Sequence, residues 1–309
     1  MGPQPMTRRW PTVAAVVATR NRPELLPVAL DSIIGQAYEG EVEIAVVYDQ
    51  SAPDHSLARR STFRTVQVLT NSRSPGLAGA RNSGIEATTA ELVAFCDDDD
   101  RWRPDKLSRQ VAAMAAAGAL SCVTGIDVHY GHTVRSRIPG TGPIGLAELS
   151  RSRMTGAHPS TFLVSRRLLT DIGMVDEELP FGYGEDYDLL IRLAGAGDIA
   201  VVPEPLVDVL WHPQSYFAQR WTGMAAGLGY LIGKHPVLRA NRRGLAWIEG
   251  QRAFALAAAG ERRAAWRAAA RSIAHDPKQP RGWLALLIGA RMLSARRVIE
   301  ALNARGRGI

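Results

Sequence analysis

The stretch from Leu92 to Asp100 constrains the fold of this chain more than any other. Its first five residues are uncharged and largely apolar, and four aspartates, Asp97 to Asp100, follow at once. A short apolar run of this kind is typical of a buried parallel strand. In open α/β sheets, ligands bind beyond the carboxyl ends of the strands. The sequence therefore predicts concentrated negative charge at a usual ligand position.

Four adjacent carboxylates repel one another, and each raises the pKa of its neighbours unless a cation lies among them. Hard oxygen ligands favour Mg²⁺ or Mn²⁺, which commonly bridge to substrate phosphates. The residues alone leave a second interpretation open. In this interpretation the four aspartates form a solvated acidic turn, and Asp105 caps the helix that follows.

The first third of the chain alternates between strands and helices. The pattern predicts four strands and, after each, a helix, which indicates a mostly parallel sheet with helices on both faces. The glycine-rich fingerprint of dinucleotide-binding folds does not follow the first strand, so a nucleotide must be held in another way. The predicted strands are 13–18, 41–48, 65–69 and 92–96, and the helices run from Pro23 to about Gln36, from Ser51 to about Ser61, from Gly76 and from Pro104.

Beyond Ala119 the pattern is looser, and the chain becomes helical to its end after Ser215. The prolines and glycines of residues 135–146 predict a loop, and helix breaks are expected near Pro236, Gly260 and Asp276. The other predictions are strands at 121–130, 160–164 and 201–211 and helices at 166–172 and 187–194.

Charge divides the chain into two zones. The net charge is +7, but from Lys234 onward there are 16 Lys and Arg against 4 Asp and Glu. The two cysteines, Cys96 and Cys122, lie in apolar segments and are interpreted as core residues, as in a reducing cytoplasm. We detect no signal peptide and no apolar stretch of the length that spans a bilayer, so the expected location is cytoplasmic.

From about Thr12 to Ser215 the chain resembles the family 2 glycosyltransferases, which are inverting enzymes with the GT-A fold. Five matches occur in the family's order. They are the first strand with its Asn21-Arg22 turn, YDQS after the second strand, GLAGARNSGI, FCDDDDRWRPDKL, and GYGEDYDLLIRL followed by WHPQS.

The resemblance assigns donor contacts to residues of the first half. Asp49 would accept the imide N–H of the nucleobase, although the family usually has two acids where this chain has Tyr48-Asp49. Arg81 would bind phosphate, since arginine stays charged and binds in a forked geometry. Alternatively, Asp49 is only part of a turn and Arg81 only forms a surface ion pair. Asn21 and the Asp97-Asp98 pair complete the donor candidates.

The resemblance also implies a divalent cation, Mg²⁺ or Mn²⁺. Asp97 and Asp99 correspond to the family's Asp-Xaa-Asp pair, with Asp99 as the metal ligand and Asp97 or Asp98 near the ribose. A histidine in the region of His212 contacts the metal or the diphosphate in several family members, and a structural role for His212 is equally open.

Asp186 is the candidate general base, because inversion needs a base on the face opposite the leaving group. Alternatively, Glu185 and Asp186 only stabilise the start of a helix through its dipole. Glu185, His158 and Trp102 are the candidates on the acceptor side. Trp102 also matches a helix start in the family, which favours a structural role.

We expect a GT-A catalytic domain over residues 1–233 and a basic helical region over 234–309. The catalytic domain would have a Rossmann-like nucleotide-sugar-binding half at about 12–118 and an acceptor-binding half at about 119–215. The apolar residues between Trp283 and Leu302 fit one helix with an apolar face. This tail either packs on the catalytic domain or docks on the inner face of an anionic membrane.

The predicted function is metal-dependent, inverting transfer of a sugar from a nucleoside diphosphate sugar to a hydroxyl acceptor: a glycan, a lipid-linked saccharide or a natural-product aglycone. Two alternatives stay open, a non-catalytic nucleotide-sugar-binding protein and a nucleotidyltransferase. No motif supports nucleic acid binding beyond the positive charge.

Overall fold

The computed structural model describes residues 10–131, 133–210 and 221–304, and in 302–304 the backbone only. The chain divides into two compact units. In the described part, the sheet unit comprises residues 10–145, 154–177 and 192–210, and the helical unit comprises 146–153, 178–191 and 221–304. The domain boundary expected at residue 233 stays a prediction.

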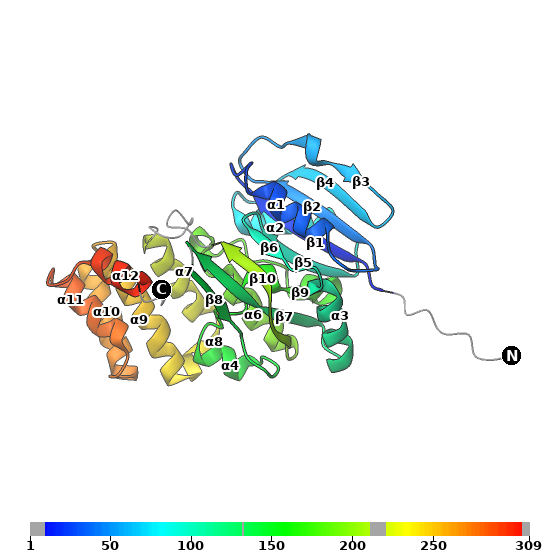
Figure 1. Cartoon of the computed structure of the whole chain (residues 1–309). Helices are drawn as coiled ribbons and strands as arrows, with labels where there is room; N and C mark the ends of the chain where they lie inside the picture. The colour runs from blue at the N-terminus through cyan, green and yellow to red at the C-terminus, as the bar shows by residue number, and fades with distance from the viewer. Residues whose placement is uncertain (1–9, 132, 211–220, 305–309) are drawn as a thin grey trace. The chain divides into compact units, whose positions relative to one another are not determined.

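The first half of the sheet unit is a parallel sheet with the strand order β4-β2-β1-β5. The two residues of β3 (Arg59–Arg60) extend it by pairing antiparallel with β4. All four carboxyl ends therefore lie along one edge, where the aspartate run begins (Figure 1). The bounds are β1 Val13–Thr19, β2 Val42–Tyr48, β4 Arg64–Thr70 and β5 Leu92–Asp97.

The second half of the sheet is mixed. β9 (Leu163–Ser165) pairs antiparallel with both β5 and β7 (Ser121–Tyr130), and so joins the two halves. β7 continues parallel to β10 (Ala200–Leu210). Beyond it, β6 (Asp100–Trp102) pairs antiparallel with β10, and β8 (Thr133–Arg137) pairs antiparallel with β7.

Helices cover both faces of the sheet, as predicted. Side chains alternate along a strand, and in β1 Val13, Ala15 and Val17 join the core beneath α1 (Leu26–Ile34) and α3 (Lys106–Ala117). The opposite face of the sheet packs against α2 (Leu77–Glu86). α5 (Arg166–Asp171) follows β9.

The helical unit is built around α9 (Arg242–Ala258), which packs against α7, α10 and α11 (Figure 1). Small residues allow the close approach: Ala265, Ala268 and Ala269 of α10 are fully buried. The remaining bounds are α4 Leu146–Arg151, α7 Trp221–Lys234, α8 Pro236–Ala240, α10 Arg262–His275, α11 Pro280–Gly289 and α12 Ala295–Ala304. α6 (Glu185–Ala196) begins in this unit and ends in the sheet unit.

Three predictions from local pattern are wrong. Only the short 3₁₀ helix His55–Leu57 forms where a helix to about Ser61 was expected, since β3 takes the residues that follow. The loop expected from residue 135 begins only after Arg137, because the edge of β7 supplies pairing partners for β8. Pro159–Thr161 is a 3₁₀ helix, so the strand expected at 160–164 begins later.

The apolar segment 283–302 is two helices and not one. Arg291 has a φ of 61°, a left-handed conformation that ends α11 before α12 begins. In the part of the chain that the structure describes, no helix has both the length and the apolarity that crossing a bilayer requires.

Candidate functional site

The four aspartates at the carboxyl end of β5 contact two sets of partners. Asp97 ends β5 and Asp100 begins β6, so Asp98 and Asp99 form the turn between the strands. Asp98 and Asp100 are buried, with 5% and 1% of their surface exposed. The acidic run is therefore not a solvated turn. It is a partly buried cluster, since Asp97 and Asp99 have 26% and 16% of their side chains exposed, and its carboxylates contact two groups of neighbours.

Arg22 holds the first group. Its Nη1 lies 2.8 Å from Asp98 Oδ1 and 2.7 Å from Asp99 Oδ2, and Thr19 Oγ1 donates to Asp98 Oδ2 at 2.7 Å. Asn21, in a left-handed conformation with a φ of 54°, makes the turn that places Arg22 there. Burial raises the pKa of Asp98, and burial together with Asp97 raises the pKa of Asp99 to about 6.

Asp97, Asp100 and His158 make up the second group, in which one ligand atom from each residue lies within 4.8 Å of the others. His158 Nδ1 is 3.3 Å from Asp100 Oδ2, and His158 Nε2 is 3.9 Å from Asp97 Oδ2. Ser160 fixes both aspartates: its hydroxyl donates to Asp100 and accepts from the backbone N–H of Asp97 at 3.0 Å.

The second group fits a divalent cation. Two carboxylates and an imidazole nitrogen are ligands that ions such as Mn²⁺ accept. Burial, followed by the charges of Asp97 and Asp99, raises the pKa of Asp100 well above its usual value. A cation among these groups would favour the ionised carboxylate. Asp99 pairs with Arg22 and lies outside this group, so its role as metal ligand stays a prediction.

Asp49 lies at the end of β2 and is 6% exposed. It accepts hydrogen bonds from Asn71 Nδ2 at 2.9 Å, from the backbone N–H of Gly76 at 3.0 Å and from Gln50 Nε2 at 2.9 Å. Burial would raise the pKa of Asp49, but the hydrogen bonds from Asn71 and Gly76 lower it below its usual value. The side chain is thus a fixed carboxylate at the sheet edge.

Arg81 reaches the aspartate run from α2. Its side chain is 4% exposed, and its Nη2 lies 2.7 Å from Asp97 Oδ1. Gly79, in the first turn of α2, has no side chain: a Cβ at this position would lie 1.9 Å from the carbonyl oxygen of Ser74. The first turn of the helix can therefore lie against the segment that precedes it.

Asp186 is the second residue of α6, in the helical unit, and only 6% of its side chain is exposed. It forms an ion pair with Arg153, and its Oδ1 accepts the backbone N–H of Tyr187 at 2.8 Å. Gly182 and Gly184, with φ values of 67° and 89°, make the turn that leads into the helix. Glu185 is also buried, at 4% exposed.

A third buried acid follows on the same helix. Asp188 is fully buried, and its Oδ1 lies 2.8 Å from Lys234 Nζ and 2.7 Å from His235 Nε2. These contacts join the start of α6 to the end of α7. They hold the helix that carries Asp186.

Three further residues were predicted for the site: Trp102, His158 and His212. Trp102 is 3% exposed, and its ring lies 4.0 Å from Lys106 Nζ, whose pKa burial lowers to about 7. His158 lies with Asp97 and Asp100, and its expected role on the acceptor side stays a prediction. His212 falls outside the described residues.

The sequence does not single out several residues of these groups. Arg22 is part of the Asn21-Arg22 turn and Asp100 is part of the run of four aspartates, but the pattern assigns neither a role. Ser160 lies two residues after His158. Arg153 follows α4 in an irregular segment, and no local pattern distinguishes it from the other arginines.

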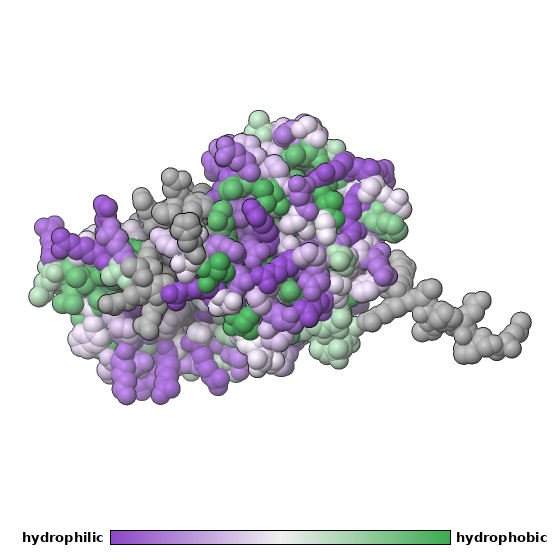
Figure 2. Space-filling model, viewed as in Figure 1, coloured by the Kyte–Doolittle hydropathy of each residue, from purple (hydrophilic) through white to green (hydrophobic). Residues whose placement is uncertain are grey.

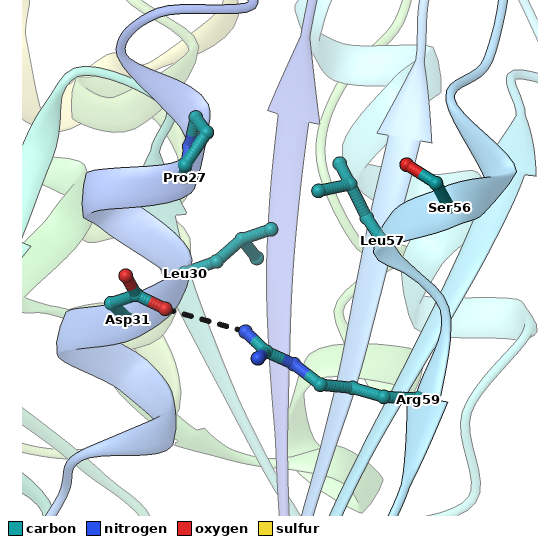
Figure 3. Close-up of a pocket in the computed structure, with 6 residues that line it drawn as sticks. All are labelled: Pro27, Leu30, Asp31, Ser56, Leu57 and Arg59. Atoms are coloured by element: carbon teal, nitrogen blue, oxygen red, sulfur yellow. Dashed lines mark hydrogen bonds and ion pairs between the residues drawn. The ribbon is translucent and has the colours of Figure 1, made fainter.

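A shallow pocket of about 250 Å³ lies elsewhere on the sheet unit, between α1 and the segment before β3 (Figure 3). Asp31 and Arg59 face each other across it, with an ion-pair distance of 3.3 Å. None of the predicted site residues lines it. Its lining residues are Pro27, Leu30, Asp31, Ser56, Leu57 and Arg59.

Comparison with known proteins decides the family. Residues 14–173 match the model of "Glycosyl transferase family 2". The chain belongs to this family. It is a glycosyltransferase, and the matched residues include the aspartate run, Asp49, Arg81 and His158.

Two curated relatives of this family 2 glycosyltransferase are bacterial. The succinoglycan biosynthesis protein ExoO of Rhizobium meliloti is 32% identical over 222 residues, which cover 67% of this chain and 62% of the relative. The UDP-Glc:alpha-D-GlcNAc-diphosphoundecaprenol beta-1,3-glucosyltransferase WfgD of Escherichia coli is 23% identical over 192 residues, which cover 62% of this chain and 72% of the relative.

Solved structures show that the glycosyltransferase has the GT-A fold. S. aureus TarS 1-349, solved in complex with UDP-GlcNAc, superposes with a TM-score of 0.60 at 19% identity, covering 96% of this chain and 92% of TarS. The mannosyltransferase PcManGT from Pyrobaculum calidifontis, in complex with GDP-Man and Mn²⁺, gives a TM-score of 0.56 at 21% identity, covering 93% and 81%.

Proposed function

We propose that this glycosyltransferase transfers a sugar from a nucleoside diphosphate sugar to a hydroxyl acceptor, with a divalent cation and with inversion at the anomeric carbon. The observation that carries the proposal is the group of Asp97, Asp100 and His158 at the carboxyl end of β5. Arg81 binds Asp97 of this group, and Arg22 binds Asp98 and Asp99 in the same run. Acids that hold a cation, together with arginines, suit a diphosphate.

The sheet unit would bind the donor. An ionised carboxylate has about four lone-pair sites, and Asn71, Gly76 and Gln50 occupy three of those of Asp49. One site remains for the imide N–H of a nucleobase. Arg81 holds Asp97 in place and can turn one N–H toward a phosphate oxygen, since a guanidinium has five N–H donors.

The metal residues are Asp97, Asp100 and His158, together with Asp99 and His212 as the family resemblance implies. When bound, the ion would neutralise the charge that develops on the departing diphosphate. The protein's part is to hold these ligands. Ser160 orients the carboxylate of Asp100 and holds the backbone of Asp97, and Arg81 binds the carboxylate of Asp97. Arg22 compensates the charge of Asp98 and Asp99.

The helical unit would supply the base. Arg153 and the backbone N–H of Tyr187 each engage one oxygen of Asp186, which fixes the plane of the carboxylate. A carboxylate held in this way can take the acceptor's hydroxyl proton as the new bond forms. Attack by that hydroxyl opposite the leaving group inverts the anomeric configuration.

The acceptor proposed first is a saccharide carried on a lipid diphosphate, because WfgD is named for such an acceptor and ExoO for polysaccharide biosynthesis. Such an acceptor would bring the enzyme to the inner face of the cytoplasmic membrane. The excess of basic residues after Lys234 suits peripheral contact with anionic lipid there.

A product assay tests the proposal. The enzyme is given UDP-glucose, UDP-GlcNAc or GDP-mannose with Mn²⁺ and lipid-diphosphate-linked saccharides. Release of the nucleoside diphosphate is followed, and the product's anomeric configuration is read by NMR. We expect an inverted linkage and acceptor-dependent release. A retained configuration contradicts inversion. In a parallel reaction given a nucleoside triphosphate and a sugar 1-phosphate, release of pyrophosphate would make the protein a nucleotidyltransferase instead.

A further inference from the structure

α11 carries apolar side chains on the face that does not pack on other helices. Gly282, Ala285, Ile288 and Gly289 form its buried face. One turn apart on the opposite face, Trp283 is 49% exposed and Leu287 is 40% exposed. Met292, just beyond the helix, is 76% exposed, and Trp266 on the neighbouring α10 is 42% exposed. We call Trp266, Trp283, Leu287 and Met292 the tryptophan face.

Both tryptophans are held in place although they are half exposed. Trp283 Nε1 donates to the carbonyl oxygen of Pro277 at 2.9 Å. Trp266 lies against Gly289, where a Cβ would be 2.5 Å from its Nε1. The rings are therefore fixed rather than free to fold back onto the protein. Figure 2 shows hydrophobic residues gathered over α11, with strongly hydrophilic residues beside them.

Arginines border the tryptophan face. The guanidinium carbon of Arg262 lies 5.5 Å from the centroid of the Trp266 ring. Arg263 and Arg267 are exposed one turn apart on α10, and Arg291 is exposed beside Met292. Residues 262–304 contain nine Lys and Arg but two Asp and Glu, and Glu300 is paired with Arg296. The border is thus strongly positive.

We propose that the tryptophan face and its arginine border dock on an anionic membrane surface. Tryptophan, leucine and methionine enter the boundary between headgroups and acyl chains, and arginines bind the phosphates above it. The positive border favours lipid over a second copy of the chain, since two copies would oppose like charges. The inference rests on the proposed function in one respect: docking would bring the enzyme to a lipid-linked acceptor.

Vesicle sedimentation with the full chain, without donor or acceptor, tests the proposal. The vesicles are phosphatidylcholine alone, or equal parts of phosphatidylcholine and phosphatidylglycerol. We expect binding only to the second kind, and weaker binding as salt is raised. Arg263→Gln with Arg267→Gln should weaken binding roughly 25-fold, since each arginine near the surface contributes about fivefold. Trp283→Ser with Leu287→Ser should weaken it at least about tenfold.

Matched controls lie on the sheet unit. Arg59 and Arg60 are also exposed, and Phe63 is 55% exposed. Arg59→Gln with Arg60→Gln, and Phe63→Ser, should bind like wild type. Equal binding to neutral and anionic vesicles, or equal loss in the control variants, would overturn the proposal. So would a concentration-dependent dimer in light scattering that the Trp283→Ser variant abolishes, because the face would then bind a second copy.

The outcome is separate from that of the proposed function. Transfer to a water-soluble acceptor analogue does not require a membrane. An enzyme that transfers sugar but ignores anionic vesicles refutes the docking surface alone. One that binds vesicles through these residues but transfers nothing refutes the proposed function alone.

Discussion

At the scale of single residues, each candidate acid binds a cationic side chain or a set of hydrogen-bond donors. Arg22 pairs with Asp98 and Asp99, and Arg153 pairs with Asp186. Paired carboxylates keep a fixed orientation and a defined charge, which both metal binding and proton transfer need. The arrangement also means that a substitution at one acid leaves an arginine without its partner, so stability has to be measured beside activity.

Asp186→Asn tests the base. Asn has nearly the same shape but takes no proton at neutral pH, so transfer should fall by roughly 10²–10⁴-fold, while donor affinity stays unchanged. The measurement is acceptor-dependent release of nucleoside diphosphate, with thermal unfolding alongside. Asp171→Asn is the control, since Asp171 is exposed on α5. Near-normal transfer would mean that Asp186 serves only as part of a helix start, and Glu185 would become the candidate.

Glu177 gives a pH-dependent prediction. Burial would raise its pKa, but hydrogen bonds from Ser74 and Asn82 and the pairing with Arg73 lower it from 4.5 to about 2. An acid whose pKa is lower in the folded state than in the unfolded state stabilises the fold at pH values above the unfolded-state pKa. This stabilisation is lost as the pH falls through the folded-state pKa. Glu177→Gln should therefore lower the free energy of unfolding by about 1–3 kcal/mol at pH 7, and by progressively less between pH 4.5 and 2.

The control for Glu177 is Glu86, which binds the same Arg73 but has 48% of its side chain exposed, against 14% for Glu177. Exposed pairs contribute about 0–1 kcal/mol. Glu86→Gln should thus change the denaturation midpoint little at any pH. If the two variants lose equal stability, or if the Glu177→Gln loss is independent of pH, the account of Glu177 is wrong.

At the scale of elements, the parallel strands and their helices were predictable because their signals are local. The apolar runs of β1, β2 and β5 and the apolar face of α3 all appear in the sequence as they do in the structure. β8 was not predicted, because its mostly polar and exposed residues form a strand only by pairing with the edge of β7. The bounds of β9 were missed because it pairs with β5, which lies far away in the chain. His158 illustrates the same limit: its approach to Asp100 follows from the β5–β9 pairing and not from any spacing in the sequence.

Gly79→Ala tests whether α2 needs its close approach. The added Cβ would lie 1.9 Å from the backbone of Ser74, so the helix carrying Arg81 must shift. We expect a loss of several kcal/mol in unfolding free energy and weakened donor binding. In α6, Gly195 has nothing within 4 Å of its Cβ position. There Gly195→Ala should stabilise by up to about 1 kcal/mol. Urea denaturation of both variants measures the contrast.

At the scale of the whole molecule, the chain combines a sheet unit that carries the donor candidates with a helical unit that carries Asp186 and the basic segment after Lys234. The sequence indicated the acidic and basic zones correctly through their composition. It could not show that residues 146–153 and 178–191 belong with the basic helices, because that grouping depends on tertiary contacts such as the Asp188–His235 pair.

The most direct test of the central claim is calorimetric titration of UDP and GDP into the enzyme, with Mn²⁺ or with EDTA. Wild type, His158→Gln and Asp100→Asn are compared with His129→Gln, a half-exposed histidine paired with Asp208 on the same sheet. The account predicts that one nucleotide binds at least about tenfold more tightly with Mn²⁺, as expected when an ion bridges protein and phosphates. It also predicts that only the His158 and Asp100 variants lose this gain. Equal affinity with Mn²⁺ and with EDTA in the wild type would contradict it.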